Sequence, residues 1–163
     1  ISTGSTWRII SGLCGRSRTG SGAAGIKLNY SNLVSPDTVV IADPEQMKKV
    51  INNIISNSVK YMDKPNGHID IRILDEVDAI RVEIEDNGKG IAQKDLQKIF
   101  ERFYRTDASR NSAQGGSGIG LSIVKKIIED HGGYVWATAK EGEGTCMHFV
   151  LRKYIELQPG GTK

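Results

Sequence analysis

The chain has 163 residues, of which 38% are hydrophobic and 25% are charged, and its formal net charge is +3. This composition is typical of a soluble globular domain with a single buried core. An apolar run of about 18 residues, the length that spans a bilayer as a helix, is absent from the sequence. Residues 1–25 hold Arg8, Arg16 and Arg18 without an acidic residue, so they carry the whole excess charge, and the remainder has 19 basic against 19 acidic residues. The charge therefore does not indicate a nucleic-acid-binding domain.

Residues 1–25 are rich in Gly, Ser and Arg and follow no helical or strand period. We interpret them as a leader that is flexible or foreign to the domain, with the folded unit at residues 26–156 and a disordered tail at 157–163. Cys14 and Cys146 form no metal or redox motif, which favours a reducing cytoplasm.

A helix is predicted at residues 43–61, after short strands at 26–30 and 38–42. Asp43 suits the N-cap, Pro44 the first helical position, and Gln46 the third position of a capping box. Along the helix an apolar arc is formed by Val50, Ile51, Ile54, Ile55 and Met62. A polar stripe of Asn53, Asn57 and Lys60 borders this arc, which indicates either a cleft wall or a solvated face.

The following segments alternate between strand and helix periods. Residues 68–74 and 79–85 alternate apolar and polar side chains, which predicts an antiparallel pair with one buried face. Helices are predicted at 93–101 and 118–131, with a polar, mobile loop at 104–117 between them, and strands at 134–139 and 145–153 end the domain. These elements predict an α/β two-layer sandwich, in which about three helices cover one face of a mixed, mostly antiparallel sheet.

Two glycine-rich segments carry the candidate chemistry. Asp86 ends a predicted strand and is followed by Gly88 and Gly90. A carboxylate is thus followed by backbone without side chains, which lets a flat ligand approach. A plain Asn-Gly turn would have the same sequence. Residues 115–120 (GGSGIG) open the next long helix, where free backbone amides favour a phosphate. Neither the Walker A spacing nor a preceding strand is present, so a nucleotide with adenine at one end and phosphates at the other is one interpretation and a flexible hinge is another.

Taken together, these segments resemble the catalytic, ATP-binding domain of bacterial sensor histidine kinases, in the GHKL (Bergerat-fold) superfamily. The resemblance covers about residues 26–153 and follows the family's boxes in order. It rests on residues 53–61 (NIISNSVKY, similar to the N box), 86–90 (DNGKG, the G1 box), 100–105 (FERFYR, the F box), 116–121 (GSGIGL, the G2 box) and 142–145 (GEGT, the last glycine element).

The resemblance implies a role for individual residues in binding ATP and Mg²⁺. Asp86 would bind the adenine amino group, with Thr145 assisting through water, and Tyr61 would stack near the base. Asn57 would be a Mg²⁺ ligand, and Asn53 would lie close to the metal and the phosphates.

The catalytic residues implied are Asn53, Lys60 and Arg105, of which Lys60 and Arg105 would contact phosphate oxygens. A lid contact is implied for Arg110. The other binding residues implied are Gly88, Gly90, Ile91, Gly116, Ser117, Gly118, Ile119, Gly120 and Leu121. Phe100 and Phe103 are expected to pack at the base of the lid.

The function implied is transfer of the ATP γ-phosphate to a histidine on a separate dimerisation domain, for relay to a response regulator. None of His68, His131 and His148 has the context of that acceptor, so we expect no autophosphorylation by this chain alone. We expect a soluble, monomeric fragment, namely the cytoplasmic portion of a membrane-anchored kinase, that binds no nucleic acid. Alternatives are a non-catalytic nucleotide-binding module, a gyrase-like ATPase and an anti-sigma serine kinase, although gyrase-like proteins have a glutamate where Asn53 stands.

Overall fold

The computed structural model describes residues 25–105 and 118–154. In this part of the chain two helices and five strands follow one another as β1 (Lys27–Asn32), α2 (Pro44–Lys60), β2 (His68–Asp75), β3 (Ala79–Asp86), α4 (Gly120–Asp130), β4 (Tyr134–Lys140) and β5 (Gly144–Arg152). The strands form one sheet in the order β1-β2-β3-β5-β4. Only the β1–β2 pair is parallel.

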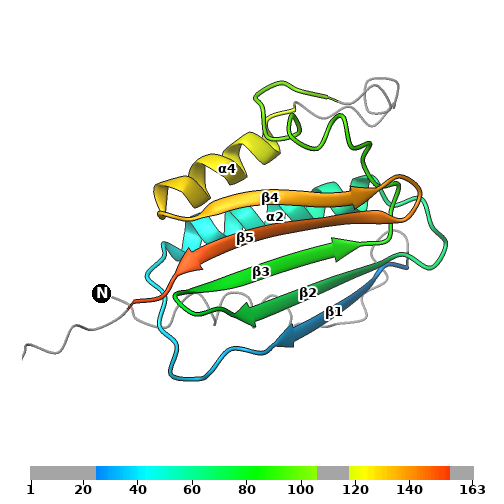
Figure 1. The fold of residues 1–163 in the computed structure, drawn as a ribbon. Helices are drawn as coiled ribbons and strands as arrows, with labels where there is room; N and C mark the ends of the chain where they lie inside the picture. Colours follow the sequence, from blue (N-terminus) through cyan, green and yellow to red (C-terminus); the bar gives the residue numbers. More distant parts are fainter. Residues whose placement is uncertain (1–24, 106–117, 155–163) are drawn as a thin grey trace, which may run out of the picture.

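Both helices lie on the same face of the sheet (Figure 1). The predicted two-layer sandwich with a mixed, mostly antiparallel sheet is therefore confirmed. Within the described ranges no helix is long and apolar enough to cross a membrane.

Strand alternation builds the sheet half of the core. Ile69, Ile71 and Ile73 of β2 are buried on the helix side, and so are the apolar residues at every second position of β3. On α2 the buried residues are Met47, Val50, Ile51, Ile54 and Ser58. Each apolar side chain buried in this way contributes about 1.5–3 kcal/mol relative to its exposure to water. The predicted arc is thus correct at its centre, whereas Met62 lies beyond the end of the helix.

The start of α2 is held by Asp43, whose Oδ1 accepts hydrogen bonds from the amides of Glu45 (2.9 Å) and Gln46 (3.2 Å). The predicted capping box is only half formed, because the amide of Asp43 donates to Nε2 of His131 (3.1 Å). The end of α4 therefore completes the N-terminal cap of α2, which fixes the two helices relative to each other.

Two predicted elements are absent from the described structure. Residues 93–101 form a run of turns with bonds such as that from the amide of Lys98 to the carbonyl of Asp95 (2.8 Å), and not a regular helix. A nine-residue segment is too short to be a stable helix without tertiary support, and here the tertiary contacts favour turns. Residues 38–42 make a single bridge, between Val40 and Lys153, instead of a strand.

Candidate functional site

Asp86 is the last residue of β3, and its carboxylate is buried, with 9% of the residue exposed. Its Oδ2 accepts a hydrogen bond from the hydroxyl of Ser58 on α2 (2.7 Å), and its Oδ1 accepts one from the amide of Gly88 (3.0 Å). A carboxylate has about four lone-pair positions, so two bonds fix its orientation and leave capacity for a further donor. Asp86 can therefore accept a further hydrogen bond.

The loop after Asp86 contains glycine where other backbone comes close. A Cβ on Gly88 would lie 2.7 Å from the carbonyl oxygen of Tyr61, and one on Gly90 (φ 72°) would lie 2.0 Å from that of Lys140. The amide of Lys89 donates to the Tyr61 carbonyl (3.1 Å). The loop is thus wedged between the end of α2 and the β4–β5 hairpin, which explains both glycines by close approach.

The hairpin forms the neighbouring wall of this site. Thr145 pairs directly with Asp86 across the β3–β5 ladder and is buried, with 8% exposed. A side chain on Gly144 would meet the carbonyl oxygen of Asp86 at 1.9 Å. The fold therefore brings Asp86, Gly88, Gly90, Tyr61 and Thr145 close to one another.

The polar stripe of α2 leads from this wall towards the start of α4. Asn53, Asn57 and Lys60 are all half-buried. At 1.5 Å per residue the stripe and Tyr61 extend over about 12 Å. The Lys60 ammonium lies 5.1 Å from the centroid of the Tyr61 ring. Asn53 and Tyr61 therefore lie at opposite ends of this part of α2.

Asn53 faces the first residue of α4. Its Nδ2 donates to the carbonyl of Lys49 (2.9 Å), and its Oδ1 lies 2.9 Å from the position that a Cβ on Gly120 would take. The N-cap of α4, Ile119, makes no side-chain capping bond, and the first turn has no acidic residue. Amides at such a helix start are available to an anion, and the helix dipole favours one.

Residues 106–117 are not described, and the chain before them meets the chain after them at Phe103 and Gly118. The amide of Phe103 donates to the carbonyl of Gly118 (2.9 Å), and both residues have positive φ, 64° and 68°. Phe103 is 64% exposed, so the expectation that it packs at the lid base is wrong, whereas Phe100 does pack against the core. Arg105 is half-buried at this point.

The remaining predicted residues divide into two groups. Ile91 and Leu121 are half-buried and pack against the core, and Ile119 is half-buried at the start of α4. Arg110, Gly116 and Ser117 lie outside the described residues.

Three residues that hold the walls of this site in place were not among the predicted site residues. Ser58 lies on the apolar arc of α2, four residues after Ile54, and a hydroxyl at a buried position is the signal that could have found it. Lys64 donates to the carbonyl of Gly142 (2.8 Å), and the side-chain amide of Gln93 donates to the carbonyl of Ala139 (2.8 Å). Both bonds hold the β4–β5 hairpin, and no local pattern in the sequence marks them.

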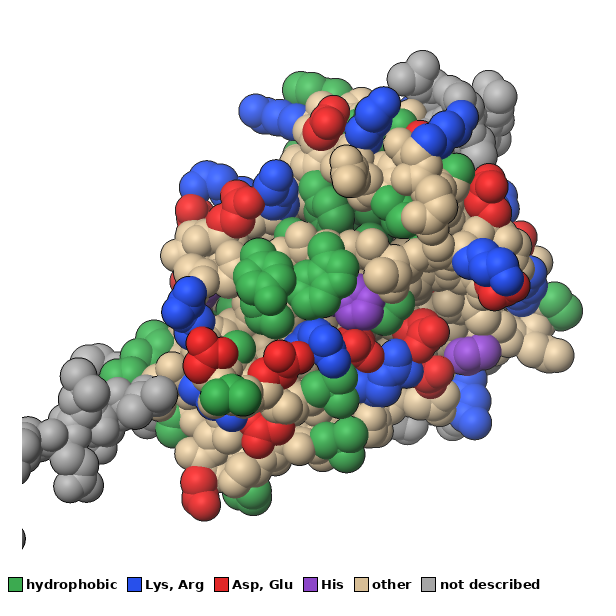
Figure 2. All heavy atoms as spheres, viewed as in Figure 1, with side chains coloured by type: hydrophobic (Ala, Val, Ile, Leu, Met, Phe, Trp, Pro, Cys, Tyr) green, Lys and Arg blue, Asp and Glu red, His purple; other side chains and the backbone are tan. Residues whose placement is uncertain are grey.

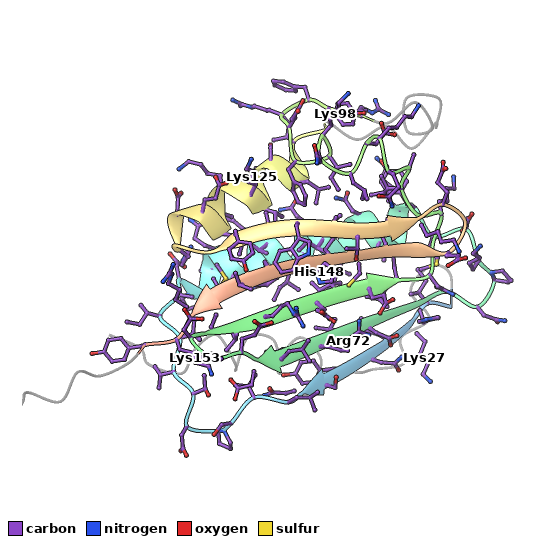
Figure 3. All side chains as sticks on the ribbon, in the orientation of Figure 1. Lys27, Arg72, Lys98, Lys125, His148 and Lys153 are labelled. Carbon is purple, nitrogen blue, oxygen red and sulfur yellow. The ribbon has the colours of Figure 1, made fainter. Side chains whose placement is uncertain are left out.

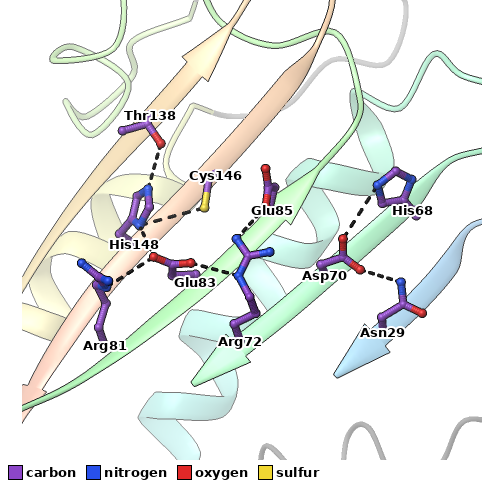
Figure 4. A network of polar contacts seen from close by, with 10 residues as sticks. All are labelled: Asn29, His68, Asp70, Arg72, Arg81, Glu83, Glu85, Thr138, Cys146 and His148. Atoms are coloured by element: carbon purple, nitrogen blue, oxygen red, sulfur yellow. Dashed lines mark hydrogen bonds and ion pairs between the residues drawn. The ribbon is translucent and has the colours of Figure 1, made fainter. Parts of the chain in front are cut away.

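A second polar network lies on the face of the sheet away from the helices (Figure 4). Hydrogen bonds from Arg72 to Glu85 (2.6 Å) and Glu83 (3.0 Å) raise the pKa of the guanidinium, in spite of its partial burial. Burial raises the pKa of the Cys146 thiol to about 12, and the charges of Glu83 and Glu85 act in the same direction. Burial lowers the pKa of His148.

Residues 42–155 match the family described as "Histidine kinase-, DNA gyrase B-, and HSP90-like ATPase". The match covers more than half of the chain, so the protein belongs to this family of ATPases. Its relatives include the sensor histidine kinase WalK of Bacillus subtilis, 40% identical over 74% of this chain and 20% of that protein. A sensor protein kinase WalK of Staphylococcus aureus is 38% identical over 67% of this chain and 26% of that protein. The chain thus spans about a quarter or less of the length of these relatives.

Solved structures agree with this assignment. A mycobacterial sensor histidine kinase, MprB, superposes with a TM-score of 0.72 at 26% identity over 91% of this chain and 93% of that chain. The catalytic domain of the histidine kinase ThkA superposes with a TM-score of 0.66 at 32% identity over 79% of this chain and 81% of that chain. Within its family, the chain is a catalytic ATP-binding domain of the sensor histidine kinase type.

Proposed function

We propose that this domain binds Mg²⁺-ATP between α2, the 86–90 loop and the start of α4, and that it transfers the γ-phosphate to a histidine of a separate dimerisation domain. The observation that carries the proposal is the arrangement of the two ends of the α2 stripe. One end adjoins the buried Asp86 carboxylate, held by Ser58, and the other adjoins Gly120 at an uncapped helix start. A nucleotide needs these two different environments, one for its base and one for its phosphates.

The adenine end is assigned to Asp86, Thr145 and Tyr61. The Asp86 carboxylate accepts from the exocyclic amino group of adenine, and Thr145, its cross-strand neighbour, supports the base through water. Tyr61 stacks near the base. The nucleotide analogue AMPPNP is present in a structure of full-length ShkA, which this chain matches with a TM-score of 0.68 at 26% identity, and that match supports a nucleotide here.

The donors present at the Asn53 end fit Mg²⁺ and phosphates. The Asn53 amide nitrogen is used by the Lys49 carbonyl, so the oxygen is the atom directed towards Gly120. Neutral amide oxygens of Asn53 and Asn57 suit a hard cation whose charge is balanced by phosphates. When bound, Mg²⁺ neutralises the charge that develops on the transferring phosphoryl group. Lys60, Arg105 and the first amides of α4 orient the phosphate oxygens.

Transfer is favoured over hydrolysis by the chemistry of Asn53. A carboxamide cannot take a proton from water, whereas a neutral imidazole needs no strong base to attack phosphorus. Each of the three histidines of this chain has a neighbour of its own: His131 contacts the Asp43 amide and the Ile127 carbonyl, His148 contacts Thr138, and Nε2 of His68 lies 3.8 Å from Oδ2 of Asp70. The acceptor is therefore assigned to another domain, and transfer within this chain is not expected.

A phosphotransfer assay tests the proposal. The domain is incubated with radiolabelled ATP and a separately purified histidine-bearing dimerisation domain, and acid-labile label on that histidine is the expected product. Asn53→Ala abolishes labelling, whereas Asn52→Ala, which changes the exposed neighbour on α2, retains it. Absence of label in spite of confirmed ATP binding would leave a nucleotide-binding module. Release of inorganic phosphate without label would point to a gyrase-like ATPase.

The wider context belongs to the same proposal. The labelled dimerisation domain relays its phosphate to a response regulator, and the domain works in the cytoplasm, where ATP is available. We propose residues 26–156 as the folded unit, and this boundary is supported as far as Tyr154, whose backbone amide bonds to the carbonyl of Val39 (2.8 Å). Limited proteolysis that leaves this unit intact and removes residues 1–25 would support the boundary.

A further inference from the structure

Three potential metal ligands of different kinds meet on the face of the sheet away from the helices. Figure 2 views this face, where charged side chains lie across the sheet beside a histidine, and Figure 3 places His148 and Arg72 on it. Glu83 of β3 is the direct cross-strand partner of His148 on β5, and Cys146 precedes His148 by two residues on the same face. One ligand atom from each of these three residues lies within 4.8 Å of the others.

The distances fit a small tetrahedral site. Nδ1 of His148 lies 3.3 Å from Oε1 of Glu83 and 4.0 Å from Sγ of Cys146. With the usual zinc bond lengths, ligand atoms in a tetrahedral site are separated by roughly 3.3–3.7 Å. We propose that Glu83, Cys146 and His148 bind a thiophilic divalent cation such as Zn²⁺, with water as the fourth ligand. Binding requires the sulfur–nitrogen distance to contract by a few tenths of an ångström, and the sulfur–carboxylate distance, which lies within 4.8 Å, to contract by up to about 1 Å.

Neighbouring side chains orient two of the ligands. Nε2 of His148 lies 2.8 Å from the hydroxyl of Thr138. When Nε2 carries the proton and donates it to Thr138, the lone pair of Nδ1 faces the cluster, as a metal-bound imidazole requires. Nε of Arg72 donates to Oε2 of Glu83 (3.0 Å), which leaves Oε1 directed at His148 (Figure 4).

Arg81 is the competing cation. Its Nε lies 3.3 Å from Oε1 of Glu83 but makes no hydrogen bond among the residues that the structure describes. Its Nη1 pairs with Glu76 (3.2 Å). Oε1 of Glu83 is therefore ion-paired with Arg81 without a hydrogen bond from Nε, and the positive charge of Arg81 opposes a cation at this position. Removal of Arg81 should consequently tighten metal binding.

The donor set separates this site from the proposed nucleotide site. Thiolate and imidazole favour Zn²⁺ or Co²⁺, whereas Mg²⁺ prefers oxygen ligands. The two sites also lie on opposite sides of the sheet, since Asp86 and Thr145 belong to the helix side of β3 and β5, and Glu83 and Cys146 to the other side. Metal binding at the cluster should therefore be insensitive to Mg²⁺ and ADP.

Cobalt titration of the full chain tests the site. The chain has two cysteines and two tryptophans, so Cys14→Ser and Trp7→Phe leave Cys146 and Trp136 as the sole thiol and indole. We expect one Co²⁺ per chain, a thiolate-to-cobalt charge-transfer band, and displacement by Zn²⁺. Because the Trp136 ring stacks on His148 at 4.8 Å, bound Co²⁺ should also quench its fluorescence.

Variants assign the ligands. Cys146→Ser abolishes the charge-transfer band. His148→Gln weakens Co²⁺ binding by at least about 10-fold, because loss of a direct ligand should cost no less than loss of a residue that only orients a ligand. Thr138→Val weakens binding, Arg81→Gln tightens it, and His68→Gln, a histidine outside the cluster, leaves it unchanged. Circular dichroism confirms that each variant is folded. A parent protein without the charge-transfer band, a band retained in folded Cys146→Ser, or displacement of Co²⁺ by Mg²⁺ would overturn the proposal.

Discussion

The hydroxyl of Ser58 donates a 2.7 Å hydrogen bond to Oδ2 of Asp86, and both residues are buried. This bond joins α2 to the end of β3 inside the site. It orients the carboxylate on which adenine recognition is proposed to depend.

Ser58→Ala should weaken binding of ADP and lower the free energy of unfolding. The variant leaves one buried oxygen of Asp86 without a donor, which costs about 1–3 kcal/mol. Calorimetric titration with ADP and urea denaturation measure the two effects. Ser56→Ala, at an exposed position on the same helix, is the matched control and should change neither. Equal affinity in Ser58→Ala and the parent would contradict the role of this bond.

Asp86→Asn should lower the affinity for adenine nucleotides by about 1–3 kcal/mol, because an amide impairs a buried polar contact with the base. Glu85→Gln is the control, since Glu85 is the preceding residue and pairs with Arg72 on the opposite side of the sheet. Calorimetric titration with ADP measures the affinity of both variants. Unchanged affinity in Asp86→Asn would remove this residue from the adenine role.

Gly120→Ala should separate stability from activity. Alanine is favoured over glycine in a helix by about 0.8–1.0 kcal/mol, so α4 itself should not be weakened. The new methyl group would lie 2.9 Å from Oδ1 of Asn53 and displace it. We expect phosphotransfer to fall at least about 10-fold, the effect of roughly 1.4 kcal/mol on a barrier, while the unfolding midpoint is retained. Full phosphotransfer would show that Asn53 tolerates displacement.

Lys64→Met should weaken ADP binding without unfolding the domain. The lost bond to the Gly142 carbonyl helps to hold the hairpin that carries Thr145, and a bond of this kind contributes about 0.5–1.5 kcal/mol. Lys125→Met, which removes a surface ion pair with Glu129, is the control. An ADP affinity equal to that of the control would exclude Lys64 from positioning the hairpin.

His148 should make the domain less stable in acid. Burial lowers its pKa in the folded state below the value of about 6.5 expected in the unfolded chain. The unfolded state therefore binds the proton more readily, and the stabilisation present above about pH 6.5 is lost as the pH falls below it. Urea denaturation in EDTA at about pH 7.5 and about pH 5.5 should show a smaller loss in His148→Gln than in the parent. Equal losses would contradict the assignment.

Local sequence patterns were sufficient to predict the elements in which apolar and polar residues alternate regularly. The alternation in residues 68–74 and 79–85 predicted β2 and β3, because every second residue of a strand faces the core. The prediction of a helix at residues 93–101 was wrong. Their apolar spacing suits a helix, but the segment is too short to be stable as one by itself. Contacts such as that of Gln93 with Ala139 favour turns instead.

The sequence by itself determined which residue types are available to the site: a carboxylate at a strand end, amides at helical spacing on α2, and glycines before α4. Tertiary structure alone decided which atoms meet. Ser58 reaches Asp86 from 28 residues away, Lys64 reaches Gly142 from 78 residues away, and the Asp43 amide bonds to His131 instead of completing a capping box with Gln46. Spacing along a chain sets periodicity within one element, but contacts between elements depend on how the helices pack on the sheet, and no local pattern encodes that packing.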